Sequence, residues 1–168
     1  MGRKRASEGV KTEPILPSDF ERFLRGLVMK EICIERVQAE VLNRSTTGGE
    51  EAVDYGEKSV LISATESEAV ILASYAVRLV PSGGVQPSAH LQATFRVTYG
   101  TEERMTDACF EQLRRLTLRI HTVPFAREWF RDASGRMGIE TILLPLSIAH
   151  PGAIPHGSRS RTRNKRGS

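Results

Sequence analysis

Two neighbouring stretches of alternating apolar and polar residues constrain the fold more than any other feature of this sequence. Every second residue of Leu91–Tyr99 is apolar or aromatic, and most of the residues between are polar. The same period runs through Val70–Val80, and the turn-forming sequence Pro81-Ser82-Gly83-Gly84 separates the two stretches. A period of two places apolar side chains on one side of an antiparallel strand. The sequence therefore predicts two long paired strands with one buried face.

Two further strands are predicted nearer the N-terminus. The first spans about 32–42, and its apolar residues change parity between Ile34 and Val37. Such a change is typical of a β-bulge, because one extra residue reverses the facing of all that follow. The second covers Ser59–Thr65, and residues 43–57, with Gly48-Gly49 and several acidic residues, are predicted to form a loop.

Three helices are predicted around these strands. Ser18 and Asp19 are candidate N-caps for a short amphipathic helix over 18–27. Thr106 and Asp107 cap a second helix that ends near His121-Thr122. Pro124 suits the first position of a third helix, because it lacks an N–H and has a fixed φ. That helix repeats apolar residues at three- and four-residue steps, and Gly138 is placed to end it.

The order of the elements predicts an α+β fold. Runs of strands followed by runs of helices favour a four-stranded antiparallel sheet covered on one face by the C-terminal helices, with a short N-terminal helix. An apolar extended segment, Ile139–Leu146, follows the last helix. We expect a disordered leader at 1–17, a single domain at 18–150 and a disordered basic tail at 151–168.

The positive charge lies in the two ends of the chain. The formal net charge is +4, yet residues 158–168 alone contribute +5 and residues 1–13 contribute +2, so residues 14–157 carry −3. A mildly acidic body argues against nucleic acid as its partner. No apolar run approaches the ~18 residues of a membrane-spanning helix, and no secretory signal follows Arg3–Arg5. We expect a cytoplasmic protein without a transmembrane segment.

The sequence contains no recognisable catalytic or metal-binding motif. The four histidines lack ligand spacing, and Cys33 and Cys109 are far apart. Cys109 is interpreted as a structural thiol, and Gly83-Gly84 as a hairpin turn rather than a phosphate-binding loop. We predict that the chain is not an enzyme and needs no metal or cofactor.

Residues of the third helix and the segment after it resemble the SecB family of export chaperones. The similarity lies in Pro124-Phe125-Ala126-Arg127-Glu128, then Arg136-Met137-Gly138-Ile139, then Leu143-Leu144-Pro145-Leu146. It covers 95–148, and the order of elements agrees. Glu140-Thr141 stand where the family usually has prolines. The N-terminal helix is closer to solitary SecB-like chaperones, including those that protect an antitoxin.

The resemblance implies an ATP-independent chaperone, or holdase, that binds unfolded polypeptides. It implies preproteins or an antitoxin as clients, the SecA translocase motor as a further partner, and a dimer of dimers. The aromatic and aliphatic residues of the third helix have two open interpretations, as core or as client contacts. We predict that the client-binding groove and arm contain Phe95, Tyr99, Phe125, Trp129, Met137, Ile139, Leu143 and Leu144.

One alternative belongs to a different class of function. The tail holds Arg159, Arg161, Arg163, Lys165 and Arg166 without an acidic residue, which suits an anionic partner. The chain would then be a nucleic-acid or membrane-surface adaptor acting through this tail. The sequence leaves open whether the segment is instead a solubilising end, because no aromatic residue is interleaved for base stacking.

Overall fold

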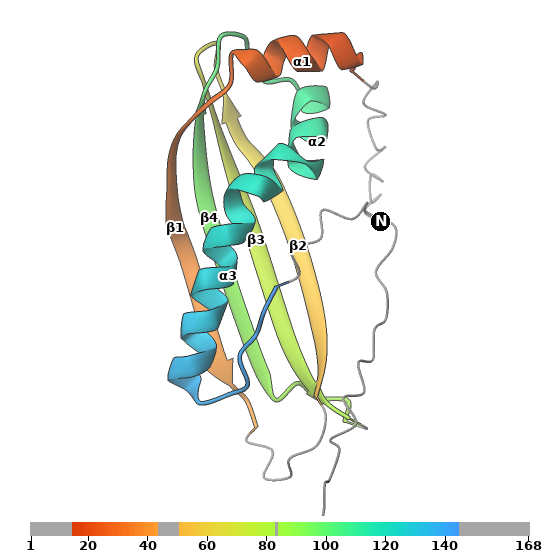
Figure 1. Ribbon diagram of the computed structural model, residues 1–168, viewed down its shortest axis with the longest axis vertical. Helices are drawn as coiled ribbons and strands as arrows, with labels where there is room; N and C mark the ends of the chain where they lie inside the picture. The colour runs from red at the N-terminus through yellow and green to blue at the C-terminus, as the bar shows by residue number, and fades with distance from the viewer. Residues whose placement is uncertain (1–14, 44–50, 83, 145–168) are drawn as a thin grey trace, which may run out of the picture.

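In the part of the chain that the structure describes, four long antiparallel strands form one sheet, and three helices lie on one of its faces. A computed structural model describes residues 15–43, 51–82 and 84–144. Its elements are α1 (Pro17–Arg25), β1 (Val28–Val41), β2 (Glu51–Ala64), β3 (Glu68–Pro81), β4 (Ala89–Gly100), α2 (Asp107–Arg115) and α3 (Thr117–Met137). The strand order is β1-β4-β3-β2, so β1 and β2 are the edges (Figure 1). The predicted α+β fold is confirmed.

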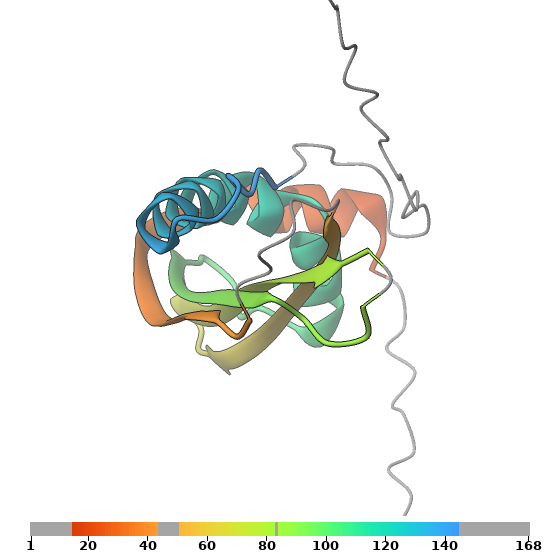
Figure 2. The same ribbon diagram turned by 90° about the horizontal axis from the view of Figure 1, so that it is seen from below.

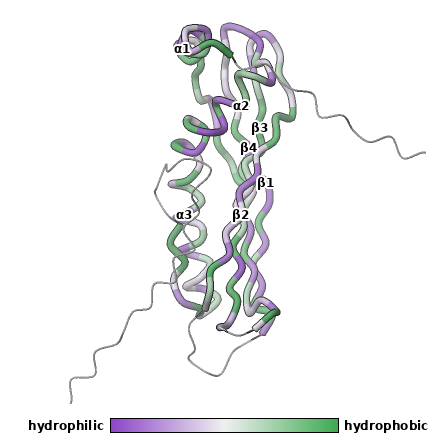
Figure 3. The backbone as a smooth tube through the Cα atoms, turned by 90° about the vertical axis from the view of Figure 1, so that its right-hand side faces the viewer, coloured by the Kyte–Doolittle hydropathy of each residue, from purple (hydrophilic) through white to green (hydrophobic). Residues whose placement is uncertain are grey.

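The alternation in β3 and β4 determines which face of the sheet is covered. Residues at one parity are almost fully buried along both strands, from Ala69 to Leu79 and from Ala89 to Tyr99. Their partners in the register, such as Tyr75 and Ala93, lie on the same face. Figure 3 shows the helices and the sheet as two layers, and this inner face lies between them. Burial of these apolar side chains at ~25 cal/mol per Å² supplies the main stabilisation of the fold.

Strand β1 has the predicted bulge. Its register on β4 shifts between Ile34 and Arg36, so Glu35 is the extra residue. After the bulge Val37 lies opposite Ala93, on the same face as Ile34 opposite Phe95. The parity change therefore keeps the apolar residues on the inner face, as the sequence predicted. A second shift between Met29 and Glu31 was not predicted.

Strand β2 corrects the prediction of a loop at 43–57. The strand starts at Glu51 and pairs with β3 over its whole length, with Asp54 opposite Arg78 and Tyr55 opposite Val77. Because β2 is an edge strand, it tolerates charged residues that would be excluded from the centre of a sheet. Those charges concealed the alternation. Residues 44–50 lie outside the described part of the chain.

The helical region also differs from the sequence prediction. α2 ends at Arg115, and α3 begins at Thr117, well before Pro124, which lies inside it. The chain turns at Leu116, whose φ of −123° and ψ of −74° interrupt the helix. An internal proline removes one main-chain hydrogen bond at a cost of about 3 kcal/mol. We attribute the tolerance of Pro124 to the packing of α3 on the sheet, which buries Leu118 and Ala126 on either side of it.

Three helix caps were predicted from the sequence, and two of these predictions are confirmed. Thr106 accepts a hydrogen bond from Cys109 N and caps α2, as predicted. Gly138 ends α3 with a φ of 66°, in the left-handed region that glycine favours, as predicted. The predicted caps Ser18 and Asp19 are wrong, because Leu16 precedes the helix and Pro17 occupies its first turn.

The ends of the chain leave part of the domain prediction untested. Residues 1–14 of the predicted leader and all of the predicted tail at 151–168 lie outside the described residues. The same holds for residues 145–150, at the end of the predicted domain. Within the described ranges, no helix combines the length and the apolar content needed to cross a bilayer.

Candidate functional site

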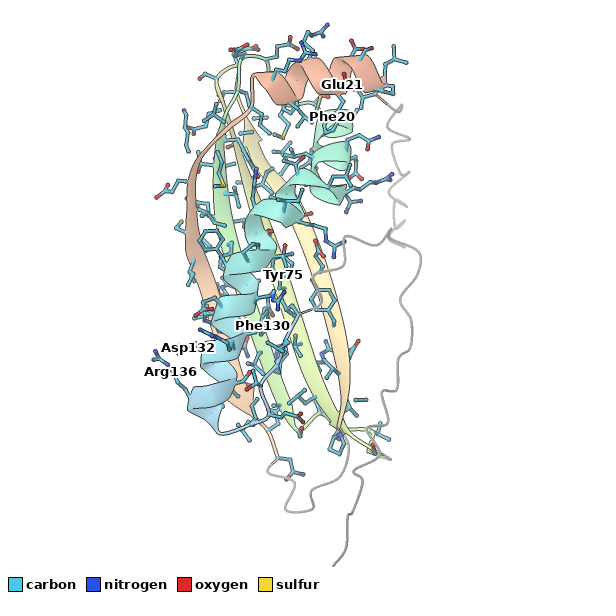
Figure 4. All side chains as sticks on the ribbon, in the orientation of Figure 1. Phe20, Glu21, Tyr75, Phe130, Asp132 and Arg136 are labelled. Atoms are coloured by element: carbon cyan, nitrogen blue, oxygen red, sulfur yellow. The ribbon has the colours of Figure 1, made fainter. Side chains whose placement is uncertain are left out.

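Helix α3 divides the inner face of the sheet into two flanks. Residues at four-residue intervals, from Leu118 to Ser134, are buried against the sheet. Phe130 is fully buried, and its ring contacts that of Trp129 at 4.9 Å between centroids. Phe130 on α3 and Tyr75 on β3, both labelled in Figure 4, belong to the same core cluster. We call the surface between α3 and β1 the β1 flank, and the surface between α3 and β2 the β2 flank.

The side of α3 that faces the β1 flank carries His121, Phe125 and Trp129. These residues are four apart, so they form one row on the helix. His121 Nδ1 lies 2.8 Å from the Tyr99 hydroxyl, and Tyr99 on β4 lies opposite Met29 on β1. Arg119, on the other side of the helix, contacts Glu57 on β2, so the row of His121 points toward β1. Phe125 is 47% exposed, and Trp129 is half-buried.

Strand β1 adds exposed apolar side chains to the same flank. Ile34 and Val37 share the inner face with their partners Phe95 and Ala93, yet they are 55% and 47% exposed. Met29 is also exposed on this face. The helix layer leaves these side chains uncovered, because α3 crosses the sheet obliquely and only its C-terminal end reaches β1 (Figure 1). The β1 flank is therefore an open apolar surface.

The β2 flank is covered in part by the segment that follows α3, although Val53, which lies opposite the buried Leu79, is still 59% exposed. After the Gly138 turn, residues 139–144, which we call the arm, run back beside α3 in the helix layer on the side of β2 (Figures 1 and 2). Ile142 and Leu144 are only 5% and 4% exposed, whereas Leu143 between them is 63% exposed. Ile142 N donates to Ser134 Oγ at 3.3 Å, and that hydroxyl donates to Phe130 O.

Polar groups from β2 and α3 meet on the β2 flank. Arg119 Nε lies 3.2 Å from Glu57 Oε2, and the Tyr55 hydroxyl donates to the same carboxylate oxygen at 3.2 Å. Both charged side chains are largely buried. Arg119 Nε contacts Glu57 without hydrogen-bond geometry, since it has no hydrogen-bond partner among the described residues. The pair leaves this flank without net charge.

Two tyrosines and one histidine on the inner face are held neutral by burial. Desolvation raises the pKa of Tyr75 to about 12, and the Tyr75 hydroxyl lies 2.5 Å from Thr122 Oγ1. Because Thr122 donates its own hydrogen to Leu118 O, Tyr75 is the donor. Desolvation also raises the pKa of Tyr99 and lowers the pKa of His121. His121 is therefore mostly neutral near pH 7, and its hydrogen bond with the Tyr99 hydroxyl and the one between Tyr75 and Thr122 join α3 to the sheet.

The predicted client-binding residues fall into three groups. Phe95, Tyr99 and Leu144 are buried, so in this chain they form support beneath the surface. Trp129, Met137 and Ile139 are half-buried at the edge of the core. Phe125 and Leu143 are exposed, but on opposite flanks. Their role in binding clients stays a prediction.

The contribution of β1 to this flank was not predicted from the sequence. The predicted strand over 32–42 excludes Met29, and the pattern of Ile34 and Val37 indicates only the bulge. The signal was present, since the bulge keeps both residues on the face of Phe95. What the sequence did not reveal is that α3 leaves them uncovered.

The outward surface of α3 is polar. An open depression of about 420 Å³ is lined by Pro124, Arg127, Glu128, Arg131 and Leu143. Glu128 pairs with Arg131, and Asp132 pairs with Arg136 at 2.9 Å, at an i,i+4 spacing that favours such pairs on a helix (Figure 4). Among the described residues, no group of three or more His, Cys, Asp or Glu side chains converges as a metal site would require.

The fold has counterparts among solved structures. The sequence matches no protein-family model and no curated protein. A SecB-like chaperone of Mycobacterium tuberculosis, solved in complex with a ChAD peptide from the HigA1 antitoxin, aligns with a TM-score of 0.68 and 19% identity. The match covers 77% of this chain and 96% of that chain. A Streptococcus agalactiae protein of unknown function aligns with a TM-score of 0.42 and 9% identity, over 71% of this chain and 96% of that one. The order of the elements and the first of these matches show that the chain has a SecB-like fold.

Proposed function

We propose that the protein is an ATP-independent chaperone that holds unfolded polypeptides on the apolar flanks of α3. The observation that carries the proposal is the exposure of Ile34 and Val37 on the inner face of the sheet and of Phe125 on the adjoining side of α3, where a folded monomer normally buries such side chains. The similarity in fold to a chaperone solved with an antitoxin peptide supports it.

The physics of the two flanks suits weak binding of many sequences. Burial of apolar area at ~25 cal/mol per Å² requires no particular order of residues in the client. Aromatic side chains and methionine, such as Phe125, Trp129 and Met137, adapt to different partners. A disordered client loses conformational entropy when it binds, so affinity per unit area is low and the complex stays reversible.

We further propose a homo-oligomer, arranged as a dimer of dimers. β1 is an edge strand whose outer main-chain groups are free to pair with another strand. The apolar β1 flank adjoins that edge, so a second copy would bury both features together. The mass of the native particle tests this proposal directly.

We propose that the protein is cytoplasmic. Two classes of client are compatible with the chaperone function. In protein translocation the clients are preproteins, and the SecA translocase motor is the further partner. In toxin–antitoxin systems the client is one antitoxin, as in the solved complex of the Mycobacterium protein. Proteins that copurify with this chain distinguish the two, since an export chaperone retains many preproteins and a dedicated one retains a single antitoxin.

Light scattering of a reduced, aggregating substrate tests the chaperone proposal. We expect a several-fold molar excess of the protein to suppress aggregation without ATP. Ile34→Asp/Phe125→Asp places charges on the open flank and should weaken protection strongly. Val60→Asp is the matched control, because Val60 is an exposed apolar residue on the outer face of the sheet. No protection by the wild-type protein would contradict the proposal.

The basic tail supports the adaptor alternative, and its deletion separates the two functions. Residues 158–168 hold five basic residues and no acid, and they lie outside the described part of the chain. If the shortened protein still suppresses aggregation, the chaperone function belongs to the folded body. If deletion abolishes retention on nucleic acid or anionic vesicles while the full-length protein lacks chaperone activity, the adaptor is correct.

A further inference from the structure

The arm on the β2 flank has the geometry of a bound peptide. The described residues 139–144 belong to no helix or strand. Their burial nevertheless alternates, with Ile142 and Leu144 facing the core and Leu143 facing solvent. Alternation of this kind is what an extended segment shows when one of its sides lies on an apolar surface.

The arm is attached to the rest of the fold mainly by these two side chains. The Gly138 cap fixes its start, with Ile139 N donating to Ser134 O at 3.2 Å. Further along, the hydrogen bond from Ile142 N to Ser134 Oγ holds the main chain. Ile142 and Leu144 then join the same core cluster as Phe130 and Tyr75. An external segment of similar shape would find the same apolar surface once the arm has left.

We infer that the arm is an internal competitor for the client site on the β2 flank. The segment of client that displaces it is extended and carries bulky aliphatic side chains at positions i and i+2, in place of Ile142 and Leu144. This inference rests on the proposed function, and it names the kind of segment that one of the two flanks accepts. The β1 flank has no such occupant among the described residues.

The charges of the β2 flank add a second requirement. Arg119 and Glu57 neutralise each other, and both are largely buried. A client charge placed beside them would lose its hydration without gaining a free partner, which is unfavourable. We therefore expect acidic or basic residues at the two anchor positions to prevent binding on this flank.

Release of the arm is the first test. A permanently unfolded, reduced and carboxymethylated polypeptide with a fluorescent label serves as the probe. Ile142→Ser/Leu144→Ser should lower the apparent Kd roughly three- to tenfold, because a larger fraction of the protein is then open. Thr141→Ala is the matched control and should leave the Kd within about twofold of the wild type, since Thr141 is an exposed residue of the same arm. Weaker binding by the double variant, or no change, would overturn the inference.

A pinned arm gives a second test, in which one variant is compared with itself in the oxidised and reduced states. Ser134→Cys/Ile142→Cys is made in a Cys33→Ser/Cys109→Ser background, since Ser134 Oγ and Ile142 N are only 3.3 Å apart. Oxidation should reduce binding of the probe several-fold, and a reductant should restore it. The variant with Ser134→Cys alone should show no response. Equal binding in the oxidised and reduced states would contradict the inference.

Synthetic peptides test whether binding requires aliphatic side chains at positions i and i+2. A synthetic peptide of residues 138–144 carrying Leu143→Ser keeps the i and i+2 anchors and should displace the probe from the β2 flank. The same peptide carrying Ile142→Ser/Leu144→Ser should not. Failure of the wild-type protein to bind the probe at all would refute the proposed function. Normal binding of the probe with equal competition by both peptides would refute only the inference.

Discussion

The two flanks of α3 are built from the same kinds of side chain but end in different states. On the β2 flank the chain supplies its own cover, and Ile142 and Leu144 are almost fully buried. On the β1 flank Ile34, Val37 and Phe125 remain about half exposed. The buried row of α3, from Leu118 to Ser134, lies between the two flanks and does not cause this difference. The difference comes from the Gly138 turn, which directs the arm toward β2.

This difference gives the two flanks different roles in assembly and in client binding. The uncovered flank adjoins an edge strand, so a second copy of the chain can use both features. The covered flank is available only to a segment that competes with the arm. Under our proposals the β1 flank serves both clients and assembly, whereas the β2 flank serves clients alone, so only substitutions on the β1 flank should change the mass of the particle.

The largest effect on stability is expected at Phe130, whose buried side chain supports both flanks of α3. Phe130→Ala removes a fully buried ring from the centre of α3 and should lower the free energy of unfolding by about 3 to 5 kcal/mol. Chemical denaturation measures the change. Phe125→Ala, one turn away and half exposed, should cost less than about 1 kcal/mol. Equal losses in the two variants would mean that α3 does not divide the surface as described.

The next effect distinguishes the flanks by self-association. Ile34→Asp/Val37→Asp should leave the monomer folded, because both side chains are exposed, and should weaken assembly by at least about tenfold in Kd. Analytical ultracentrifugation measures the particle mass. Leu143→Asp places the charge on the exposed side of the arm and should leave the mass unchanged. Loss of assembly in the Leu143 variant alone would reverse our assignment of the β1 flank.

The sequence predicted the two central strands, the bulge of β1 and the end of α3 better than it predicted the edge strand β2 and the start of α3. The alternation in β3 and β4, the bulge of β1 and the Gly138 cap were all readable, because each depends on local chain geometry. The first half of β2 was not, since an edge strand carries charges that hide its period. The start of α3 was missed because tertiary packing tolerates Pro124 within the helix.

The candidate site was less predictable for a related reason. Periodicity identifies which residues share a face, but it does not show how far a neighbouring layer extends. Ile34 and Leu91 have the same inward facing, yet only Leu91 is covered. The reverse holds in the arm, where Leu143 and Leu144 look equivalent in sequence and have opposite exposure. Alternation in a six-residue segment without regular structure is too short a signal to assign.

A smaller effect tests the attachment of the arm on the β2 flank. Ser134→Ala removes the acceptor for Ile142 N and the donor to Phe130 O. The loss of unfolding free energy should be about 1 kcal/mol. Hydrogen exchange should accelerate at the Ile142 amide more than at amides in β4. Unchanged protection of Ile142 would show that the apolar contacts alone hold the arm.

The smallest effect concerns pH and the base of the β1 flank. Burial lowers the pKa of His121 below its usual 6.5. As pH falls through 6.5 the unfolded chain therefore takes up a proton that the folded chain does not yet bind, and stability falls until the folded pKa is passed. His121→Gln should flatten this dependence between about pH 7.5 and 5. Tyr99→Phe should keep it, because desolvation rather than the hydroxyl lowers the pKa. Denaturation midpoints across this range measure the slope, and a wild-type slope in His121→Gln would assign the pH dependence to other groups.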